Sequence, residues 1–544
     1  MQRKIDLLEP FQRAIAKAHL AAAGVDLNSL DSKPIIAIVN SWNEVCPGHE
    51  PLLKLAEDVK KGVLESGGEP IEFNTVAMCD GIAQGHDGMK YCLPHRELIS
   101  DSIEAMIVGE GVFDGMVLIG SCDKILPGML NAAARINIPS IVVTCGPCYA
   151  EIKPSEASQL RRDFLCGKIS ERELIEGTLR YYTGGGVCPF MGTANTMACL
   201  CEALGMMLPG GSLIPSETSL RRNHARQSGR KIVELVEKDV KPADIITEDA
   251  LYNAGVVLCA IGGSLNAMLH LPALAFELGL TMNWDKIAHI SNCIPVITQI
   301  VPNGDRTVID LYKAGGIPAI MKELYSELKL DAMTVACESV RNNLNRSDNL
   351  NPDIIYRYDD ARAKVDGIQV LYGNIAEEGA LIKTSAVPES LKKYTGKAKV
   401  FDCEKDCYKA FKNNEINEGD VIVIRYEGPS GGPGMREMHR VTEIMKGFDR
   451  IALVTDGRLS GASSGLCICC VCPEAAKQKG LSAVKTGDII DIDLDSAAVN
   501  VRLDEITILE RIQKVLPPDK TIGSRFLNRY ARTVSPANEG AALK

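Results

Sequence analysis

The sequence contains no run of about 18 apolar residues, so we expect no membrane-spanning helix. Its start, MQRKIDLLEP, has no apolar core of signal-peptide length. Internal repeats and low-complexity tracts are also missing. Positive charge is in deficit, because 60 Lys and Arg residues stand against 70 Asp and Glu residues, for a formal net charge of −10. This balance weighs against nucleic acid or an anionic membrane as a partner.

The length and the composition predict an ordinary globular protein of several domains. The chain has 544 residues, which is too long for one compact core and predicts two to four domains. Charged residues make up 24% and hydrophobic residues 46%, as in typical globular proteins.

Nineteen cysteines are the unusual feature of the composition. A secreted disulfide scaffold is short and rich in loops, and this chain is neither. We therefore expect a cytoplasmic protein in a reducing compartment, with some thiolates reserved for metal. Most of the cysteines should be small buried hydrophobic residues.

The first part of the chain alternates apolar runs with helical patterns. Buried strands are predicted over residues 34–39, 113–120 and 138–144, and a helix over residues 52–66. This alternation predicts a doubly wound α/β layer, in which functional loops gather at the carboxyl ends of the strands. Asn40, Cys122 and Cys145 lie at such ends.

The pattern changes after about residue 360. Short strands are predicted over residues 367–372, 419–425, 450–454 and 487–494, separated by turns rich in Gly and Asp. We expect an N-terminal α/β/α layered domain over residues 1–360, followed by a smaller β-barrel-like domain over residues 361–544. The polar stretch 343–353 is a candidate boundary region.

Two segments of the first domain carry candidate metal ligands. SCDKILPGM (121–129) follows a predicted strand and supplies a thiol, a carboxyl group and an amine in succession. Thiolate suits iron, and carboxylate suits a hard cation such as Mg²⁺. The alternative is a plain capping turn. GVCPFMGTANTM (186–197) places Cys188 before a predicted helix, whose N-terminus lowers a thiol pKa; the alternative is a buried structural cysteine.

Two segments of the second domain are candidates for catalysis. RYEGPSGGPGMREM (425–438) is a rigid turn that presents Glu437. TDGRLSGAS (455–463) follows a predicted strand and places Ser460 in a tight turn. Such a serine serves as a nucleophile, a base or a turn former.

Together these four segments resemble the dihydroxy-acid dehydratase family, which includes phosphogluconate and sugar-acid dehydratases. The resemblance covers nearly the whole chain, and its most specific motifs are CDKxxPG (122–128) and TDGRxSG (455–461). Further matches are NSWNE (40–44), DGIA (80–83), GGS (262–264), GN (373–374) and Lys383. The family fold, an α/β domain followed by a barrel-like domain, agrees with the pattern above.

The resemblance implies a role for each matching residue. It implies that Cys122 and Cys188 bind an iron–sulfur cluster, and that Ser460 is the catalytic base. It also implies a site for Mg²⁺ or Mn²⁺, whose ligands would be Asp80, Asp123, Glu437 and Lys124, the last as a carbamylated lysine. Members of the family are homodimers or homotetramers.

The sequence departs from the family at the third cluster ligand. Many members have a cysteine where this chain has Gly48. Cys46, two residues earlier, is the candidate replacement. A branch of the family that also carries glycine there is associated with a [4Fe-4S] cluster, so the cluster is either [4Fe-4S] or [2Fe-2S].

Two other groups of cysteines resemble known motifs. CGPC (145–148) has the sequence of a thioredoxin-type dithiol, but it follows a strand of a much larger layer, where we expect a turn. Cys467, Cys469, Cys470 and Cys472 lie in a predicted strand. An alternating strand would divide them between two faces, which favours packing over a zinc site.

The expected function is therefore that of a hydro-lyase that converts a 2,3-dihydroxy acid, a small molecule, to a 2-oxo acid. The leading substrate is 2,3-dihydroxy-3-methylbutanoate, in branched-chain amino-acid biosynthesis. The first alternative is a sugar-acid (aldonate) dehydratase. The second is an iron–sulfur redox sensor without catalysis, although such a sensor needs neither a base nor ligands for a divalent ion.

Overall fold

The computed structural model describes residues 3–360, 362–363, 365, 367–459, 465–518, 520 and 523–544. Within them, four parallel strands form a sheet in the order β2-β1-β3-β4. These strands are β1 (Ile35–Asn40), β2 (Glu69–Asn74), β3 (Gly115–Ile119) and β4 (Ser140–Val143). Every residue of β1, β3 and β4 is buried, as expected for a parallel sheet with both faces covered.

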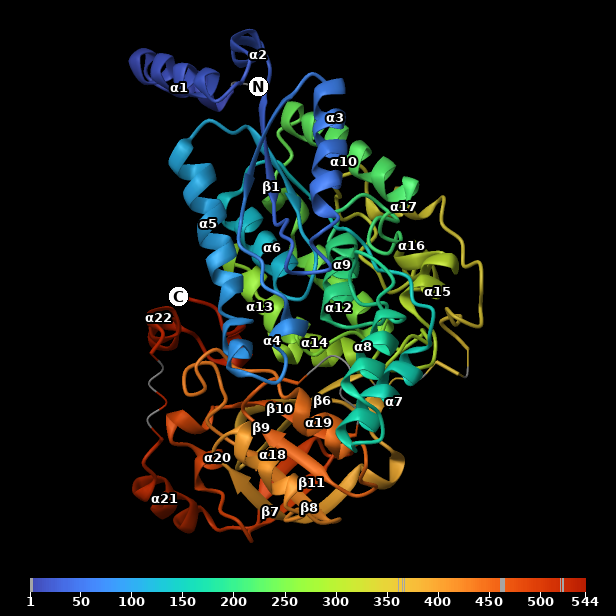
Figure 1. Cartoon of the computed structure of the whole chain (residues 1–544), viewed down its shortest axis with the longest axis vertical. Helices are drawn as coiled ribbons and strands as arrows, with labels where there is room; N and C mark the ends of the chain where they lie inside the picture. Colours follow the sequence, from blue (N-terminus) through green and yellow to red (C-terminus); the bar gives the residue numbers. More distant parts are fainter. Residues whose placement is uncertain are drawn as a thin grey trace.

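Helices cover the sheet (Figure 1). The pair α3 (Leu52–Glu65) and α10 (Ser219–Glu237) packs beside β1 and β3. These two helices approach each other closely at two glycines. A Cβ atom at Gly62 would lie 2.0 Å from the carbonyl oxygen of Arg226, and one at Gly229 would lie 2.1 Å from that of Val59. Small residues at both positions therefore set the distance between the helices.

Within the described residues, this part of the chain has fifteen further α-helices. They are α1 (Pro10–Ala22), α2 (Leu27–Ser32), α4 (Asp80–Ala83), α5 (His95–Glu110), α6 (Ile125–Ile136), α7 (Pro154–Leu165), α8 (Glu171–Leu179), α9 (Thr193–Ala203), α11 (Pro242–Ile245), α12 (Glu248–Ala260), α13 (Ala267–Glu277), α14 (Trp284–Ser291), α15 (Val308–Lys313), α16 (Gly316–Glu323) and α17 (Val340–Leu344).

In the described part of the second half, eight strands close a barrel in the order β10-β6-β5-β12-β11-β7-β8-β9. They are β5 (Ile368–Gly373), β6 (Ala376–Lys383), β7 (Lys393–Phe401), β8 (Asp420–Ile424), β9 (Ala452–Thr455), β10 (Leu466–Cys472), β11 (Ile489–Asp493) and β12 (Ala498–Val501). The helices of this half are α18 (Glu404–Lys412), α19 (His439–Met445), α20 (Gly480–Ala483), α21 (Glu505–Lys514) and α22 (Arg525–Thr533). The barrel lies below the α/β layers in Figure 1.

The C-terminal segment returns from the barrel to the α/β layers (Figure 1). The buried Arg96 of α5 donates hydrogen bonds to the carbonyl oxygens of Gly540 and Ala541 at 3.0 and 2.9 Å. Ala537 and Ala541 belong to the same hydrophobic core as the sheet. The last residues of the chain therefore help to join the two halves.

The predicted α/β layer and barrel are confirmed, with two differences in detail. The edge strand β2 was not predicted, because its sequence EPIEFN is half polar and none of its residues is fully buried. The predicted division of four cysteines between two faces of β10 is wrong. The pairing of β10 with β6 shifts register between Cys469 and Cys472, so all four pack in one core while Leu466, Ile468 and Val471 face the barrel interior.

Among the helices that the structure describes, none has both the length and the apolar character that a membrane span requires.

Candidate active site

Three carboxylates from distant parts of the chain meet at the edge of the sheet that faces the barrel. Asp80 begins α4, just after β2, and Asp123 lies between β3 and α6. Glu437 comes from the barrel half, between β8 and α19. One oxygen atom of each carboxylate lies within 4.8 Å of those of the other two. The structure therefore brings together all three predicted carboxylate ligands.

The amine of Lys124 lies among these carboxylates. Its Nζ is 3.0 Å from Asp80 Oδ2, 3.5 Å from Asp123 Oδ2 and 4.0 Å from Glu437 Oε2. The side chain is fully buried. An ammonium group in this position occupies the place that a cation bound by the three carboxylates would take.

Burial and charge set the pKa values of this group in opposite directions. Burial raises the pKa of Glu437 and Asp123 above the ordinary values, although the charge of Lys124 acts against this. For Asp80, burial also acts to raise the pKa, but the charges of Lys124, His95 and Arg458 lower it overall. Burial acts to lower the pKa of Lys124, yet the Asp80 carboxylate raises it. The amine is therefore charged in the metal-free protein.

Glu437 is held by a second buried cation, Arg458. The Nη1 of Arg458 donates to Glu437 Oε2 at 3.1 Å and to Asn266 Oδ1 at 3.0 Å. Asn266 in turn donates to Thr193 Oγ1, at the start of α9, at 2.9 Å. A backbone bridge also pairs Glu437 with Arg458. This network fastens the barrel half to the α/β layers at the site.

Thiols gather beside the carboxylates. The Sγ atoms of Cys46 and Cys122 are 3.5 Å apart, and a ring nitrogen of His49 lies within 4.8 Å of both. Cys122 has a φ of 52°, a left-handed conformation that costs energy and recurs at functional sites. The hydrogen bond with Cys46 acts to lower the pKa of Cys122, but burial raises it to about 12.

Cys188 lies outside this close group. Its carbonyl oxygen accepts a hydrogen bond from Asn195 at 2.7 Å, and its Sγ is 3.6 Å from the hydroxyl of Tyr182. The predicted lowering of its pKa by a helix N-terminus is wrong for the metal-free protein, since burial raises the pKa to about 11. Helix α9 begins five residues later, at Thr193, and the influence of a helix end fades within one turn.

Cys79 is a thiol of this site that we did not predict. It precedes Asp80, and the nearby thiol of Cys46 raises its pKa above the ordinary value. The signal was present in the sequence, because the pair Cys79-Asp80 repeats the order of Cys122-Asp123.

Ser460, the predicted base, lies outside the described residues. The two residues before it, Arg458 and Leu459, are buried in the segment that follows β9. Asp456 accepts hydrogen bonds from the backbone N–H groups of Tyr426, Glu427 and Ala475, at 2.9 to 3.0 Å.

A cavity of about 610 Å³ adjoins the thiols. Most of its lining is apolar, and Cys79, Ile82 and His95 form the part nearest the carboxylates, while Phe526 closes it from the C-terminal segment. Ring stacking between Tyr91 and Phe526, with centroids 6.0 Å apart, fixes that wall.

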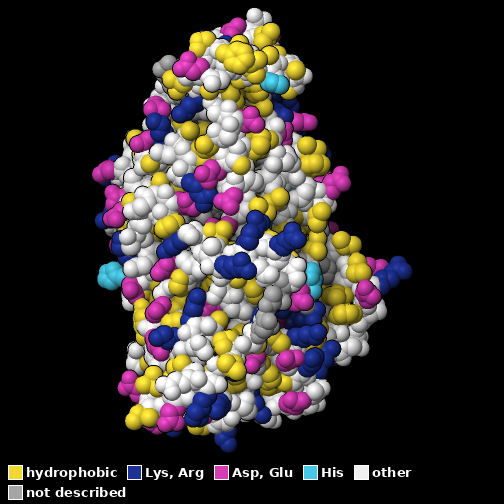
Figure 2. Space-filling view, turned by 90° about the vertical axis from the view of Figure 1, so that its left-hand side faces the viewer, with side chains coloured by type: hydrophobic (Ala, Val, Ile, Leu, Met, Phe, Trp, Pro, Cys, Tyr) yellow, Lys and Arg dark blue, Asp and Glu magenta, His cyan; other side chains and the backbone are white. Residues whose placement is uncertain are grey.

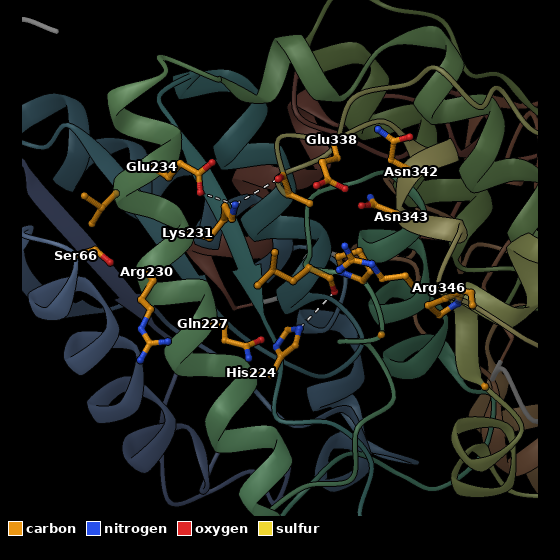
Figure 3. A pocket seen from close by; sticks show the side chains of 18 of the residues that line it. Ser66, His224, Gln227, Arg230, Lys231, Glu234, Glu338, Asn342, Asn343 and Arg346 are labelled. Carbon is orange, nitrogen blue, oxygen red and sulfur yellow. Dashed lines mark hydrogen bonds and ion pairs between the residues drawn. The ribbon is translucent and has the colours of Figure 1, made fainter.

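A second cavity, of about 1030 Å³, lies between α10 and the segment around α17. Figure 3 shows His224, Gln227 and Lys231 on one side of it and Asn343 and Arg346 on the other. None of the predicted site residues that the structure describes lines this cavity.

The CGPC segment has the character of a packed turn. Cys145 and Cys148 are both free and almost fully buried. Burial raises their pKa values to about 11 and 12, whereas a reactive dithiol needs a lowered pKa and exposure.

Comparisons with known proteins agree along the whole chain. The family model described as dihydroxy-acid/6-phosphogluconate dehydratase N-terminal matches residues 33–343, and the corresponding C-terminal model matches residues 353–541. A dihydroxy-acid dehydratase of Caldicellulosiruptor saccharolyticus is 44% identical and covers 98% of both chains. Those of Acetivibrio thermocellus and Methanococcus maripaludis are each 45% identical, again over 98% of both chains.

Proposed function

Because the chain belongs to the dihydroxy-acid/6-phosphogluconate dehydratase family, we propose that it removes water from a 2,3-dihydroxy carboxylic acid to give a 2-oxo acid. We propose 2,3-dihydroxy-3-methylbutanoate as its substrate and 3-methyl-2-oxobutanoate as its product, a step of branched-chain amino-acid biosynthesis. The observation that carries the proposal is the meeting of Asp80, Asp123 and Glu437 around Lys124, beside a group of thiols.

The carboxylate group fits a divalent ion. Hard oxygen ligands are those that Mg²⁺ and Mn²⁺ prefer, and Oδ1 of Asp80 is buried without a hydrogen-bond partner in the described residues. Asp80, Asp123 and Glu437 would hold the ion. Lys124 would join them as a carbamate, which exchanges its positive charge for a negative one and frees the position of the ammonium group.

The thiol group fits an iron–sulfur cluster. We propose Cys122 and Cys188 as ligands, with a third ligand drawn from the thiols beside Cys122, where the sequence predicts Cys46. The proximity of Cys46 and Cys122 supports this proposal. Each thiol that binds iron would lose its proton.

When bound, the cluster and the divalent ion would act as Lewis acids toward the leaving hydroxyl group and the substrate carboxylate. The chain itself would move the proton. Ser460, as an alkoxide, would take the proton from C2, and the electrons of that C–H bond would form the C2=C3 double bond as the C3–O bond breaks. The proton taken by Ser460 then leaves with the hydroxyl group as water. The resulting enol tautomerises to the 2-oxo acid.

The apolar cavity favours a branched alkyl substrate over a sugar acid. Val76, Ile82 and Phe526 line it with carbon atoms, next to the helix that carries Asp80. An alkyl group gains free energy on entering such a space. The additional hydroxyl groups of a sugar acid would gain nothing from contact with these carbon atoms.

We further propose that the protein is a homodimer in the cytoplasm, with a homotetramer as the alternative. Helix α1 has no buried residue. The large hydrophobic side chains of Leu7, Phe11 and Ile15, in and just before this helix, are exposed. Figure 2 shows hydrophobic side chains gathered at this end of the molecule. A second copy that covers these side chains would remove their apolar surface from water. Light scattering should give twice the chain mass, and Phe11→Asp should reduce it to one chain.

The test of the activity is a panel of dihydroxy acids and aldonates, incubated anaerobically with the protein and Mg²⁺. We expect 2-oxo acid from 2,3-dihydroxy-3-methylbutanoate, and a kcat/KM for aldonates lower by about tenfold or more. A preference for an aldonate would overturn the branched-chain assignment. A protein that keeps iron and Mg²⁺ but turns over none of the panel would instead support the redox sensor.

A further inference from the structure

Two Cys-Asp pairs follow neighbouring segments of the same sheet. Cys79-Asp80 comes after β2 and Cys122-Asp123 after β3, on either side of β1. Both aspartates belong to the candidate divalent site. The two cysteines also converge on the thiol of Cys46, from the loop after β1. Its Sγ lies 3.5 Å from that of Cys122, and it interacts electrostatically with the thiol of Cys79. Three adjacent strands therefore each deliver one thiol to the same place.

Position 48 cannot supply a cluster ligand in this chain. Gly48 has no side chain, and a Cβ atom built there would lie 2.6 Å from Cys122 Sγ and 3.3 Å from a methyl group of Val187. The thiol of Cys122 occupies the space beside this glycine. The third ligand must therefore come from another position.

Spacing distinguishes Cys79 from Cys46 as that ligand. Two thiolates on one tetrahedral metal, each at about 2.3 Å, lie about 3.8 Å apart. Cys46 and Cys122, at 3.5 Å, match a pair on a single iron. A [4Fe-4S] cluster takes one thiolate on each iron, so its ligands lie farther apart. Cys79 and Cys188 both lie outside the close group that Cys46 forms with Cys122.

Its greater exposure to solvent also favours Cys79 over Cys46 as the third cluster ligand. Cys46 is 1% exposed. Cys79 is half-buried and lines the cavity of about 610 Å³ that we propose for the substrate. A cluster bound through Cys79 would lie beside that cavity.

We propose that Cys79 is the third protein ligand of a [4Fe-4S] cluster, with Cys122 and Cys188, and that Cys46 donates a hydrogen bond to the ligand sulfur of Cys122. The inference rests on the cluster that the proposed function requires. Three thiolates leave the fourth iron without a protein ligand and therefore open to substrate. Hydrogen bonds to ligand sulfurs tune the reduction potential of such clusters, which gives Cys46 its role.

Iron binding tests the assignment without recourse to activity. Full-length wild type, Cys79→Ala and Cys46→Ala are reconstituted anaerobically with iron and sulfide, desalted, and analysed for iron and sulfide per chain. Cys122→Ser is the control for loss of a ligand. Cys201→Ala, a fully buried thiol on α9 with no place in the site, is the matched control. Circular dichroism and thermal unfolding show which variants fold.

We expect the iron retained by Cys79→Ala to fall to the level of the Cys122→Ser control, since each variant lacks one direct ligand of the cluster. Cys46→Ala and Cys201→Ala should keep their iron, with a shifted reduction potential in Cys46→Ala only. Full iron in Cys79→Ala overturns the assignment, and so does loss of iron in Cys46→Ala alone.

Two further results keep the outcome interpretable. If Cys79→Ala does not fold, Cys79→Ser replaces it, because oxygen ligation changes the electron paramagnetic resonance spectrum of the reduced cluster while a structural role leaves it unaltered. If Cys122→Ser also keeps all of its iron, the cluster site of the proposed function fails, and the assignment of Cys79 fails with it.

Discussion

Replacing Lys124 with methionine should destabilise the metal-free protein in a way that Mg²⁺ reverses. The Lys124 ammonium is fully buried and lies 3.0 to 4.0 Å from three carboxylates. Methionine has a similar volume but leaves that negative charge without its central counter-ion. Breaking a buried ion pair by removing one partner costs about 3–5 kcal/mol. We expect a loss of this size in the free energy of unfolding of the α/β half.

The assay is chemical unfolding of metal-free protein at neutral pH, repeated with Mg²⁺. The divalent ion replaces the missing charge in Lys124→Met, so its stabilising effect should be larger in the variant than in the wild type. Lys383→Met is the matched control. Lys383 is also buried, but its Nζ donates to the carbonyl oxygen of Gly262 at 2.6 Å, and burial lowers its pKa to about 7. Lys383→Met should lower the free energy of unfolding by about 1 kcal/mol, and Mg²⁺ should not change this difference.

The sign of the pH dependence provides a second check. The pKa values of Asp123 and Glu437 are raised by burial, so their protonation stabilises the folded state at low pH, and this contribution is lost as pH rises through the folded pKa values. The deficit of Lys124→Met should therefore shrink as pH falls. A deficit below about 1 kcal/mol at neutral pH, within the range of ordinary surface substitutions, would refute the close grouping of these carboxylates.

Three further predictions concern the base, the histidines and the helix packing. Ser460→Ala should lower turnover by about 10²–10⁴-fold with iron and Mg²⁺ contents unchanged, whereas a serine that only shapes its turn would leave the activity per folded molecule intact. Burial lowers the pKa values of His49 and His95 to about 4, so the metal-free protein should lose stability as pH falls from about 6.5 to 4, at roughly 1.4 kcal/mol per pH unit for each histidine. Denaturant titrations across this range measure the slope, and a flat profile contradicts the assignment. Gly62→Ala should cost roughly 1–3 kcal/mol by forcing α3 away from α10, while Gly109→Ala, which meets nothing within 4 Å, should be neutral or stabilising; equal effects in thermal unfolding would contradict the packing argument.

Sequence periodicity predicted those elements whose burial is uniform. The run IIAIV of β1 is apolar throughout because helices cover both faces of its strand, and the barrel strands β8 and β11 begin one or two residues inside the predicted limits. β2 was not predicted, because an edge strand is partly exposed and its sequence therefore contains polar residues. The register shift in β10 was also beyond prediction, since it arises from pairing with β6 and not from the local sequence.

The candidate site was predicted through motifs, and its geometry required the fold. Local sequence explains why Asp123 and Lys124 are neighbours, but Glu437 lies more than three hundred residues away and reaches them only because the barrel docks on the sheet. Arg458 was part of a recognised motif, yet its bond to Glu437 depends on a bridge between two loops. Cys79 directly precedes the DGIA motif (80–83) and is not part of it, so the motifs did not predict this ligand.

The two proposed centres share the same short segments, and this has a physical reason. Adjacent side chains leave the backbone in different directions, so a Cys-Asp pair that follows a strand can offer a thiol to one centre and a carboxylate to another. Cys122-Asp123 and Cys79-Asp80 both do this, and β1 between them adds Cys46. The same short segments therefore supply soft thiol ligands to the proposed cluster and hard carboxylate ligands to the proposed divalent ion. The substrate that we propose needs a Lewis acid at each of two neighbouring positions, and adjacent residues on rigid strand ends are the most direct way for a fold to fix that separation.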